Sequence, residues 1–311
     1  MSTGSASATE VFEQLRPRLR GVAYRMTGSV SDAEDICQEC WLRWAGVDHA
    51  QVRDTEAFLV SVATRLAIDR QRQAAVRRES YTGPYLPEPL VSAPGGGVLG
   101  VSQTADPAEA AELADSLTYA FLVLLDELDP VERAVVLLHD VFGYPFASVA
   151  DAVDKSEPAV RKIASRARRR LREEQPRSSV RPSDDKVGEV LASLLTAVSA
   201  GDVKLVMSHM APDVVEMSDG GAVRRAGRRP VIGPERVSRL LVNLAQRGSH
   251  LDLRFVEVNA RPGLLLSEGD EPFMAMSVDF DEQGRINRLF SVLNPDKLVH
   301  LGGEGAHLRM D

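Results

Sequence analysis

A cluster of cationic and polar side chains between residues 157 and 172 has the composition of a nucleic-acid contact. Guanidinium and ammonium groups hold phosphates, and the same groups hydrogen-bond to the edges of bases. In a helix, these side chains fall on the face opposite the apolar residues. They are Arg161, Lys162, Ser165, Arg166, Arg168, Arg169 and Arg172, with no acidic residue among them. The cluster predicts contact with DNA, and the alternative is a solvated basic helix.

Two short helices are expected to position this cluster. Phe146, Val149, Ala150 and Val153 repeat at the spacing of one apolar helix face. Residues 154–156 break that pattern, and Ser156 is a suitable N-cap for a second helix. Two helices joined by a three-residue turn, the second one basic, are typical of a helix-turn-helix that reads the major groove.

Cys37 and Cys40 form the chain's single CxxC motif, a spacing compatible with redox chemistry or zinc binding. No second pair of ligands follows, and the nearest histidine is His49. Structural zinc needs four ligands. We therefore interpret both cysteines as small buried hydrophobic residues and expect no metal and no cofactor.

Composition limits the class of protein. A chain of 311 residues is expected to form two or three domains, and 44% hydrophobic residues suffice for packed cores. The net charge is −8, yet residues 161–172 are strongly basic while residues 106–140 carry nine acidic side chains and one basic one, Arg133. This asymmetry favours local DNA contact, with other surfaces left for protein partners. No signal peptide or long apolar run is seen, so we expect a cytoplasmic protein without membrane contact.

Patterns along the chain predict a multi-domain fold, with two all-α domains followed by an α+β domain. The first helical domain covers 8–82 and includes a helix from Ser31 to Trp44 and another from Thr55 to Arg78. A linker (83–105) precedes the second helical domain (106–174), which holds the helix-turn-helix. After a second linker (175–185), residues 186–300 alternate helical and strand patterns, and 301–311 form a tail.

The sequence resembles a known family over residues 10–173. SDAEDICQECWLRW, AFLVSVATRLAIDRQR and LDELDPVERAVVLLHDVFGYPFASVADAVDKSEPAVRKIASRARRRL look like the two conserved regions of extracytoplasmic-function sigma factors, the promoter-recognition subunits of bacterial RNA polymerase. Residues 186–298 resemble a SnoaL-like domain, a cone-shaped α+β fold. Such a domain behind the sigma regions is similar to the sigma factor J type. YLPEP (85–89), NPDKL (294–298) and DGG (219–221) resemble motifs of that subgroup.

The resemblance implies roles for two sets of residues in the first domain. One set would dock on a coiled coil of the largest polymerase subunit: Asp35, Gln38, Trp41 and Leu42. The other would bind the downstream promoter box as a melted single strand: Arg65, Asp69, Arg70, Arg72, Gln73 and Arg77. The alternative for both sets is an ordinary solvated helix face.

In the second helical domain, the resemblance implies that the basic helix reads the upstream promoter box as duplex DNA. The expected contacts are Glu157, Arg161, Lys162, Ser165, Arg166 and Arg169. Base edges are usually read by the first turns of such a helix, so Arg168, Arg169 and Arg172 are assigned to phosphates.

For the C-terminal domain, catalysis, ligand sensing and protein contact are all open. His209, Asp219, Asp252 and Asp279 could act as acids or bases, but no two have a spacing that demands chemistry, so we expect no enzyme. We expect regulation in cis, without a separate anti-sigma factor, since tethering raises the effective concentration to roughly millimolar. Exposed Asp296 and Lys297, with Leu298 seeking a partner, are expected to meet an exposed Tyr85 and Leu86. The expected contact residues are Tyr85, Leu86, Asp219, Gly220, Gly221, Asn294, Pro295, Asp296, Lys297 and Leu298.

A second class of function remains open at this point. A one-component helix-turn-helix regulator with a ligand-sensing or enzymatic C-terminal domain would carry the same basic helix. It would have no need of the helices at 31–44 and 55–78.

Overall fold

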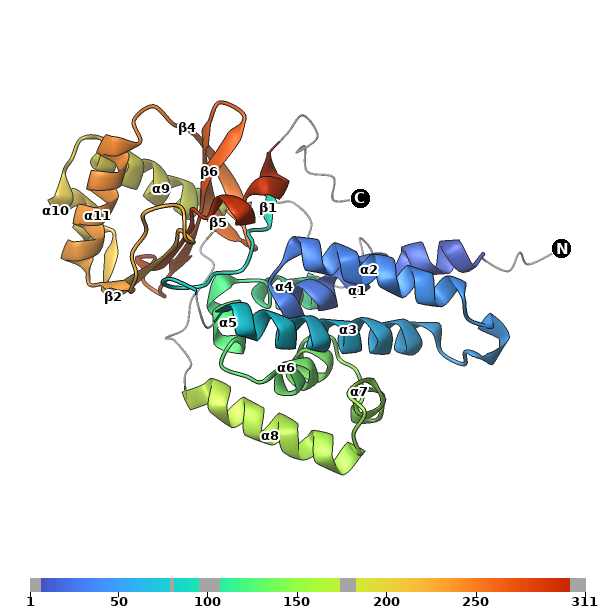
Figure 1. Ribbon diagram of the computed structural model, residues 1–311. Helices are drawn as coiled ribbons and strands as arrows, with labels where there is room; N and C mark the ends of the chain where they lie inside the picture. Colours follow the sequence, from blue (N-terminus) through green and yellow to red (C-terminus); the bar gives the residue numbers. More distant parts are fainter. Residues whose placement is uncertain (1–6, 79–80, 95–106, 174–182, 303–311) are drawn as a thin grey trace. The chain divides into compact units, whose positions relative to one another are not determined.

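The computed structural model describes residues 7–78, 81–94, 107–173 and 183–302. The chain divides into two compact units, each of which combines separate stretches of sequence. Unit 1 contains Met1–Glu79 and Gly97–Gln175, and unit 2 contains Ser80–Gly96 and Pro176–Asp311. Figure 1 shows the helical unit 1 and the sheet-containing unit 2.

Unit 1 begins with α1 (Ala8–Thr27), α2 (Val30–Ala45) and α3 (Thr55–Arg78), with a short 3₁₀ helix, η1 (His49–Gln51), before α3. Ser7 and Glu10 form a capping box at the start of α1, and Gly28 ends it with a left-handed φ of 70°. The N-cap of α2 is Ser29, whose hydroxyl accepts the Asp32 N–H, so the predicted start at Ser31 was wrong by two residues.

Unit 1 continues with α4 (Pro107–Asp115), α5 (Tyr119–Leu125), α6 (Pro130–Val136), the π-helical turn η2 (Leu137–Val141), α7 (Phe146–Ala152) and α8 (Glu157–Glu173). Asp129 and Glu132 form a capping box for α6. The sequence patterns indicated two separate helical domains, whereas both helical groups pack into the same unit.

Buried Arg25 joins the two helical groups of unit 1. Its guanidinium donates to Ser116 Oγ (2.7 Å) and to the Leu113 carbonyl (2.7 Å), and Arg133 Nε donates to the Arg25 carbonyl (3.0 Å). Burial lowers the pKa of Arg25 to about 9. Backbone and hydroxyl oxygens therefore satisfy a cation that has left the solvent.

Unit 2 is an α+β domain, as the sequence predicts. Among the described residues, one sheet has the order β1-β4-β5-β6-β7-β2-β3, antiparallel except for the parallel pair β2–β7. The strands are β1 (Val91–Ser92), β2 (Met210–Asp219), β3 (Val231–Ile232), β4 (Asp252–Val258), β5 (Arg261–Glu268), β6 (Glu271–Phe280) and β7 (Ile286–Val292).

Three helices complete unit 2 together with this sheet (Figure 1): α9 (Asp184–Ser199), α10 (Val203–Ser208) and α11 (Pro234–Arg247). The core joins Leu191 and Leu194 of α9 to Val237 and Leu241 of α11 and to alternate strand residues such as Met276. Two 3₁₀ turns, η3 (Pro295–Lys297) and η4 (Val299–Leu301), follow β7. Burial follows no strict alternation in these strands: β6 and β7 are buried on both faces over most of their length, and the first four residues of β4 are exposed.

Residues 81–94, which we call the strap, belong to unit 2 although they lie between α3 and α4 in sequence. β1, at the end of the strap, pairs with β4 through Val91–Val258 and Ser92–Glu257. Leu90 and Asn259 add two hydrogen bonds next to this pairing. Residues 83–105 were expected to form a linker, and their described part instead includes β1 at the edge of the sheet. No helix in the described ranges is long and apolar enough to cross a membrane.

Candidate nucleic-acid and polymerase interfaces

The helix-turn-helix is formed by α7 and α8. Between them, Asp154 adopts a left-handed φ of 53°, and the Lys155 N–H donates to the Ala150 carbonyl (3.0 Å). Val160, Ala164 and Ala167 bury the inner face of α8. Lys162, Ser165 and Arg169 are exposed on the outer face, as the period of the helix requires.

Several arginines of α8 form ion pairs within unit 1. Arg161 pairs with Glu157 (2.6 Å) and lies over the Phe146 ring, 4.4 Å from its centroid. Arg166 donates to Glu132 (2.7 Å), which is 4% exposed, and Arg168 pairs with Asp140. The pattern of α8 alone could not indicate Glu132 and Asp140, because α6 and η2 supply these carboxylates from elsewhere in the sequence.

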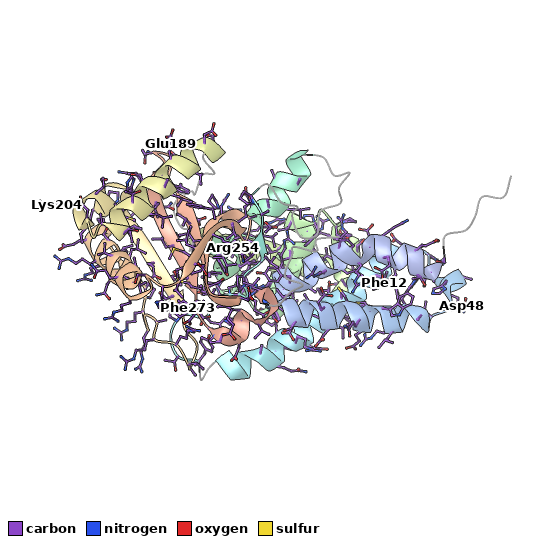
Figure 2. All side chains as sticks on the ribbon, turned by 90° about the horizontal axis from the view of Figure 1, so that it is seen from above. Phe12, Asp48, Glu189, Lys204, Arg254 and Phe273 are labelled. Atoms are coloured by element: carbon purple, nitrogen blue, oxygen red, sulfur yellow. The ribbon has the colours of Figure 1, made fainter. Side chains whose placement is uncertain are left out.

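The exposed side of α2 carries the residues assigned to the polymerase. Asp35, Gln38 and Leu42 are exposed at i, i+3 and i+7, and Leu42 has 69% of its surface accessible. Trp41 is half-buried because its ring packs against Phe12, 5.2 Å between centroids. Figure 2 labels Phe12 on α1. The helix therefore presents an acid, an amide and an apolar side chain in that order along its exposed side.

The residues assigned to the downstream box lie along α3, and several of them bond to other residues of unit 1. Arg65 donates to the carbonyls of Asp151 (2.6 Å) and Ala152 (3.2 Å), at the end of α7. Arg70 pairs with Asp32 (2.9 Å), and an exposed pair joins Arg72 to Asp69 (3.3 Å). Gln73 is exposed, and the side chain of Arg77 lies outside the described part of the structure.

A second bridge connects the same two helical groups. The Tyr144 hydroxyl donates to Glu56 Oε1 (2.6 Å) and accepts from Arg18 Nε (2.8 Å). Burial, followed by the hydrogen bond to Glu56, raises the pKa of Tyr144. Tyr144, two residues before the start of α7, is thus bonded to both α1 and α3.

Cys37 and Cys40 are both buried in α2. Burial raises the pKa of each thiol to about 12. A thiol with such a pKa is neither a good nucleophile nor a ready metal ligand. This agrees with the interpretation of both residues as small hydrophobic core residues.

In unit 2, the Asp219 carboxylate gathers the motifs singled out in the sequence. It accepts from the Tyr81 hydroxyl, from the Leu86 N–H (2.9 Å), from the Gly221 N–H (3.1 Å) and from Lys297 Nζ (2.7 Å). Asp219 is completely buried. The YLPEP, DGG and NPDKL segments therefore meet at one carboxylate.

Lys297 closes this cluster from the other side. Its ammonium also donates to the Leu86 carbonyl and lies over the Tyr85 ring, 3.2 Å from the centroid. Asn294 Nδ2 donates to the Tyr81 hydroxyl (2.9 Å), and burial raises the pKa of Tyr81. The expectation that Lys297 and Leu86 are exposed was wrong: both are buried, because the strap and η3 cover one another. Leu298, which was expected to find a partner, is buried as well. Asp296 is exposed, as expected.

The glycines of DGG are required by close packing. A Cβ on Gly220 would lie 2.4 Å from the Arg224 carbonyl oxygen, and one on Gly221 would lie 2.7 Å from the Asn294 side chain. Gly221 also has a left-handed φ of 61°. Pro295 begins η3, and Asn294 caps it by accepting the Asp296 N–H (3.1 Å).

The four residues considered for acid–base chemistry have different partners. His209 bonds to Ser193 (3.0 Å), and burial lowers its pKa. Asp279 faces Arg261 (3.3 Å), Asp252 is exposed, and Asp219 belongs to the strap cluster. The structure does not gather them into one catalytic group.

Comparison with known proteins identifies the class of protein that this fold defines. Residues 11–77 match the family model of sigma-70 region 2, and residues 119–171 match that of sigma-70 region 4. The two helical groups are thus the polymerase-binding and promoter-binding regions of a sigma factor.

Relatives define the family more narrowly. The chain is 38% identical over 297 residues to the ECF RNA polymerase sigma factor SigJ of Mycobacterium tuberculosis, covering 93% of this chain and 92% of that one. It is 29% identical to the probable ECF sigma factor SigI of the same species, over 93% and 94%. The crystal structure of M. tuberculosis SigJ matches with a TM-score of 0.70 at 33% identity, covering 94% of this chain and 98% of that one.

The chain belongs to the ECF RNA polymerase sigma factors. It is a transcription factor that binds core RNA polymerase and promoter DNA, with a SnoaL-like α+β domain behind the sigma regions. A one-component regulator would not carry the region 2 helices, so that alternative is set aside.

Proposed function

We propose that the SnoaL-like domain regulates this sigma factor in cis by holding the connection between regions 2 and 4. Asp219, Gly220, Gly221 and the segment Asn294–Leu298 bind the strap through Tyr85 and Leu86. The domain then acts as a regulator and not as an enzyme, and it replaces a separate anti-sigma factor.

The observation that carries this proposal is the burial of Asp219 and Lys297 against the strap. Two buried charges on the domain are satisfied in part by Tyr81 and by both backbone groups of Leu86. Detaching the strap would leave these charges without those partners, and this would raise the free energy of the domain. The domain is therefore built to keep the strap bound.

The length of chain between regions 2 and 4 links the bound strap to promoter recognition. When the strap is bound, the segment 95–106 alone joins it to α4. Whatever its conformation, a segment of that length spans at most about 43 Å. When the strap is released, residues 81–94 also become part of the connection, and the greatest possible distance between regions 2 and 4 increases. The bound strap thus limits the distance between the two promoter boxes that regions 2 and 4 can occupy together.

We assign the contacts of the sigma regions as follows. Asp35, Gln38, Trp41 and Leu42 dock on the coiled coil of the largest polymerase subunit. The upstream box is read by Glu157, Arg161, Lys162, Ser165, Arg166 and Arg169. The downstream box is bound by Arg65, Asp69, Arg70, Arg72, Gln73 and Arg77. The exposure of Gln38, Leu42, Lys162 and Ser165 supports these assignments.

The test uses the full chain reconstituted with core polymerase on promoters that differ only in the spacing of the two boxes. The double variant Tyr81→Phe/Leu86→Ala loosens the strap. We expect it to transcribe from promoters with longer spacers, at threefold or more above the unaltered protein. The control is Arg239→Gln, which changes an exposed pair on α11 away from the strap.

An unchanged spacer profile in the folded double variant would contradict the regulatory proposal while leaving the sigma factor assignment intact. Loss of transcription at every spacer, with core binding retained, would show that the strap supports promoter binding in a different way.

A further inference from the structure

Unit 2 contains an apolar cavity of about 400 Å³ between the sheet and its helices. Its walls come from α9, α11 and strands β5 to β7, and they include Leu191, Leu194, Leu264, Met276, Leu289 and Phe273. Figure 2 labels Phe273 on β6. This volume is in the range of small-molecule sites, and nothing in the strap cluster contributes to the walls.

The opening of the cavity is cationic. Arg224, Arg225 and Arg247 also line it, and the last two are exposed, while Leu191, Leu194, Leu264 and Leu289 are buried. His250 lies in the same lining, 3.9 Å from Glu268. The Arg224 guanidinium lies 4.0 Å from the centroid of the Phe273 ring, so it is held at the edge of the apolar wall. No carboxylate is among the residues that line the cavity.

A cavity of this kind selects by two features at once. The leucine and methionine walls favour an apolar body, because each methylene that leaves water for an apolar environment lowers the free energy of binding. The guanidinium groups at the opening favour a negative head group, since charge-assisted hydrogen bonds are stronger than neutral ones. A fully polar ligand or a cation meets at most one of these two conditions.

We propose that the cavity of the SnoaL-like domain binds an amphipathic monoanion, an unbranched apolar chain that ends in a carboxylate. The apolar chain lies among Leu264, Met276 and Leu289. The carboxylate lies at the opening, within reach of Arg225 and Arg247. This site goes beyond the regulatory contact, because its residues are separate from Asp219, Lys297 and the strap.

The test is isothermal titration of the full chain with decanoate and with 1-decanol, which has the same chain length and no charge. We expect saturable 1:1 binding of decanoate with a negative heat-capacity change. Decanol should bind at least about tenfold more weakly, the ratio that one charge-assisted contact supplies. Absence of saturable decanoate binding, or equal affinity for both, would overturn the proposal.

Two variants locate the site. Arg225→Gln/Arg247→Gln changes exposed positions and should weaken decanoate about tenfold while leaving decanol unchanged. Ala245→Phe, on the α11 wall, should fill the cavity and abolish binding of both probes. Arg239→Gln, on α11 outside the cavity, is the matched control and should behave as the unaltered protein. Unchanged decanoate affinity in the double variant would overturn the proposal even if Ala245→Phe failed to fold.

Discussion

Lys297 Nζ lies 2.7 Å from Asp219 Oδ2, and the two side chains are 7% and 0% exposed. The pair joins the end of β2 to η3, and the strap completes its hydrogen bonds through Leu86 and Tyr81. A buried ion pair of this kind is stabilising only when other polar groups satisfy it. The strap is therefore part of the folded domain.

Removing one partner of this pair is expected to destabilise unit 2 strongly. Lys297→Met leaves the buried Asp219 charge without its cation and should lower the free energy of unfolding by about 3–5 kcal/mol. Amide exchange of β1 and β2 at increasing urea concentrations, followed by mass spectrometry, measures the stability of unit 2. Lys186→Met breaks an exposed pair with Glu189 and should cost less than about 1 kcal/mol. Equal effects of the two substitutions would show that the buried pair has no special role.

The exposed stripe of α2 should determine affinity for core polymerase. Leu42→Asp combined with Gln38→Ala places a charge on the apolar contact and should weaken core binding at least about tenfold, which corresponds to about 1.4 kcal/mol. The melting temperature should stay unchanged because both side chains are exposed. Leu205→Asp, at an exposed leucine of α10, is the control. Binding is measured by titrating labelled sigma factor into core enzyme, and unaltered affinity would rule out this docking face.

Base contacts and phosphate contacts made by α8 should differ in how their loss changes the salt dependence of DNA binding. Lys162→Ala, on the early exposed turns, should cost about 1–3 kcal/mol on the cognate upstream box and little on random DNA. Arg169→Ala should weaken both DNAs equally and reduce the salt slope by about one. Binding is followed by fluorescence anisotropy at several salt concentrations. The assignment fails if both variants lose the same affinity on both DNAs.

Arg65 should contribute to the packing of the helix-turn-helix on α3. Arg65→Ala removes two charge-assisted bonds to the carbonyls of Asp151 and Ala152. Because the side chain is exposed, we expect a loss of only about 1 kcal/mol, seen as faster amide exchange in α7. Arg72→Ala, which breaks the exposed pair with Asp69, is the control and should leave that exchange unchanged. Slower or equal exchange in Arg65→Ala would contradict this contact.

Cys37 and Cys40 should resist alkylation in the folded protein. With pKa values of about 12, both thiols stay protonated at pH 8, and both are buried. Iodoacetamide should label them at least about a hundredfold more slowly than in the unfolded chain, because fewer than one thiol in a thousand is ionised. Mass spectrometry of labelled peptides measures the rates. Equal rates in folded and unfolded protein would show that α2 opens freely.

The sequence alone determined the helix-turn-helix and the basic face of α8, because both depend on local spacing. The apolar stripe at Phe146, Val149 and Val153 and the break at 154–156 identify the helix-turn-helix from neighbouring residues. The resemblance also depended on short motifs, and it predicted that DGG, YLPEP and NPDKL contact one another.

Only the tertiary structure decided which charged side chains are satisfied within the protein. Arg166 and Arg168 lie on the basic face of α8, but Glu132 and Asp140 reach them from other helices. Lys297 reads as an exposed cation, yet Asp219 lies 78 positions away in sequence and Leu86 lies 211 away. Such pairings join residues that are far apart in sequence. The spacing of residues within one helix or strand therefore cannot indicate them. For that reason the strap, a proline-rich stretch that resembles a linker, became an edge strand and a buried anchor of the sheet only in the folded domain.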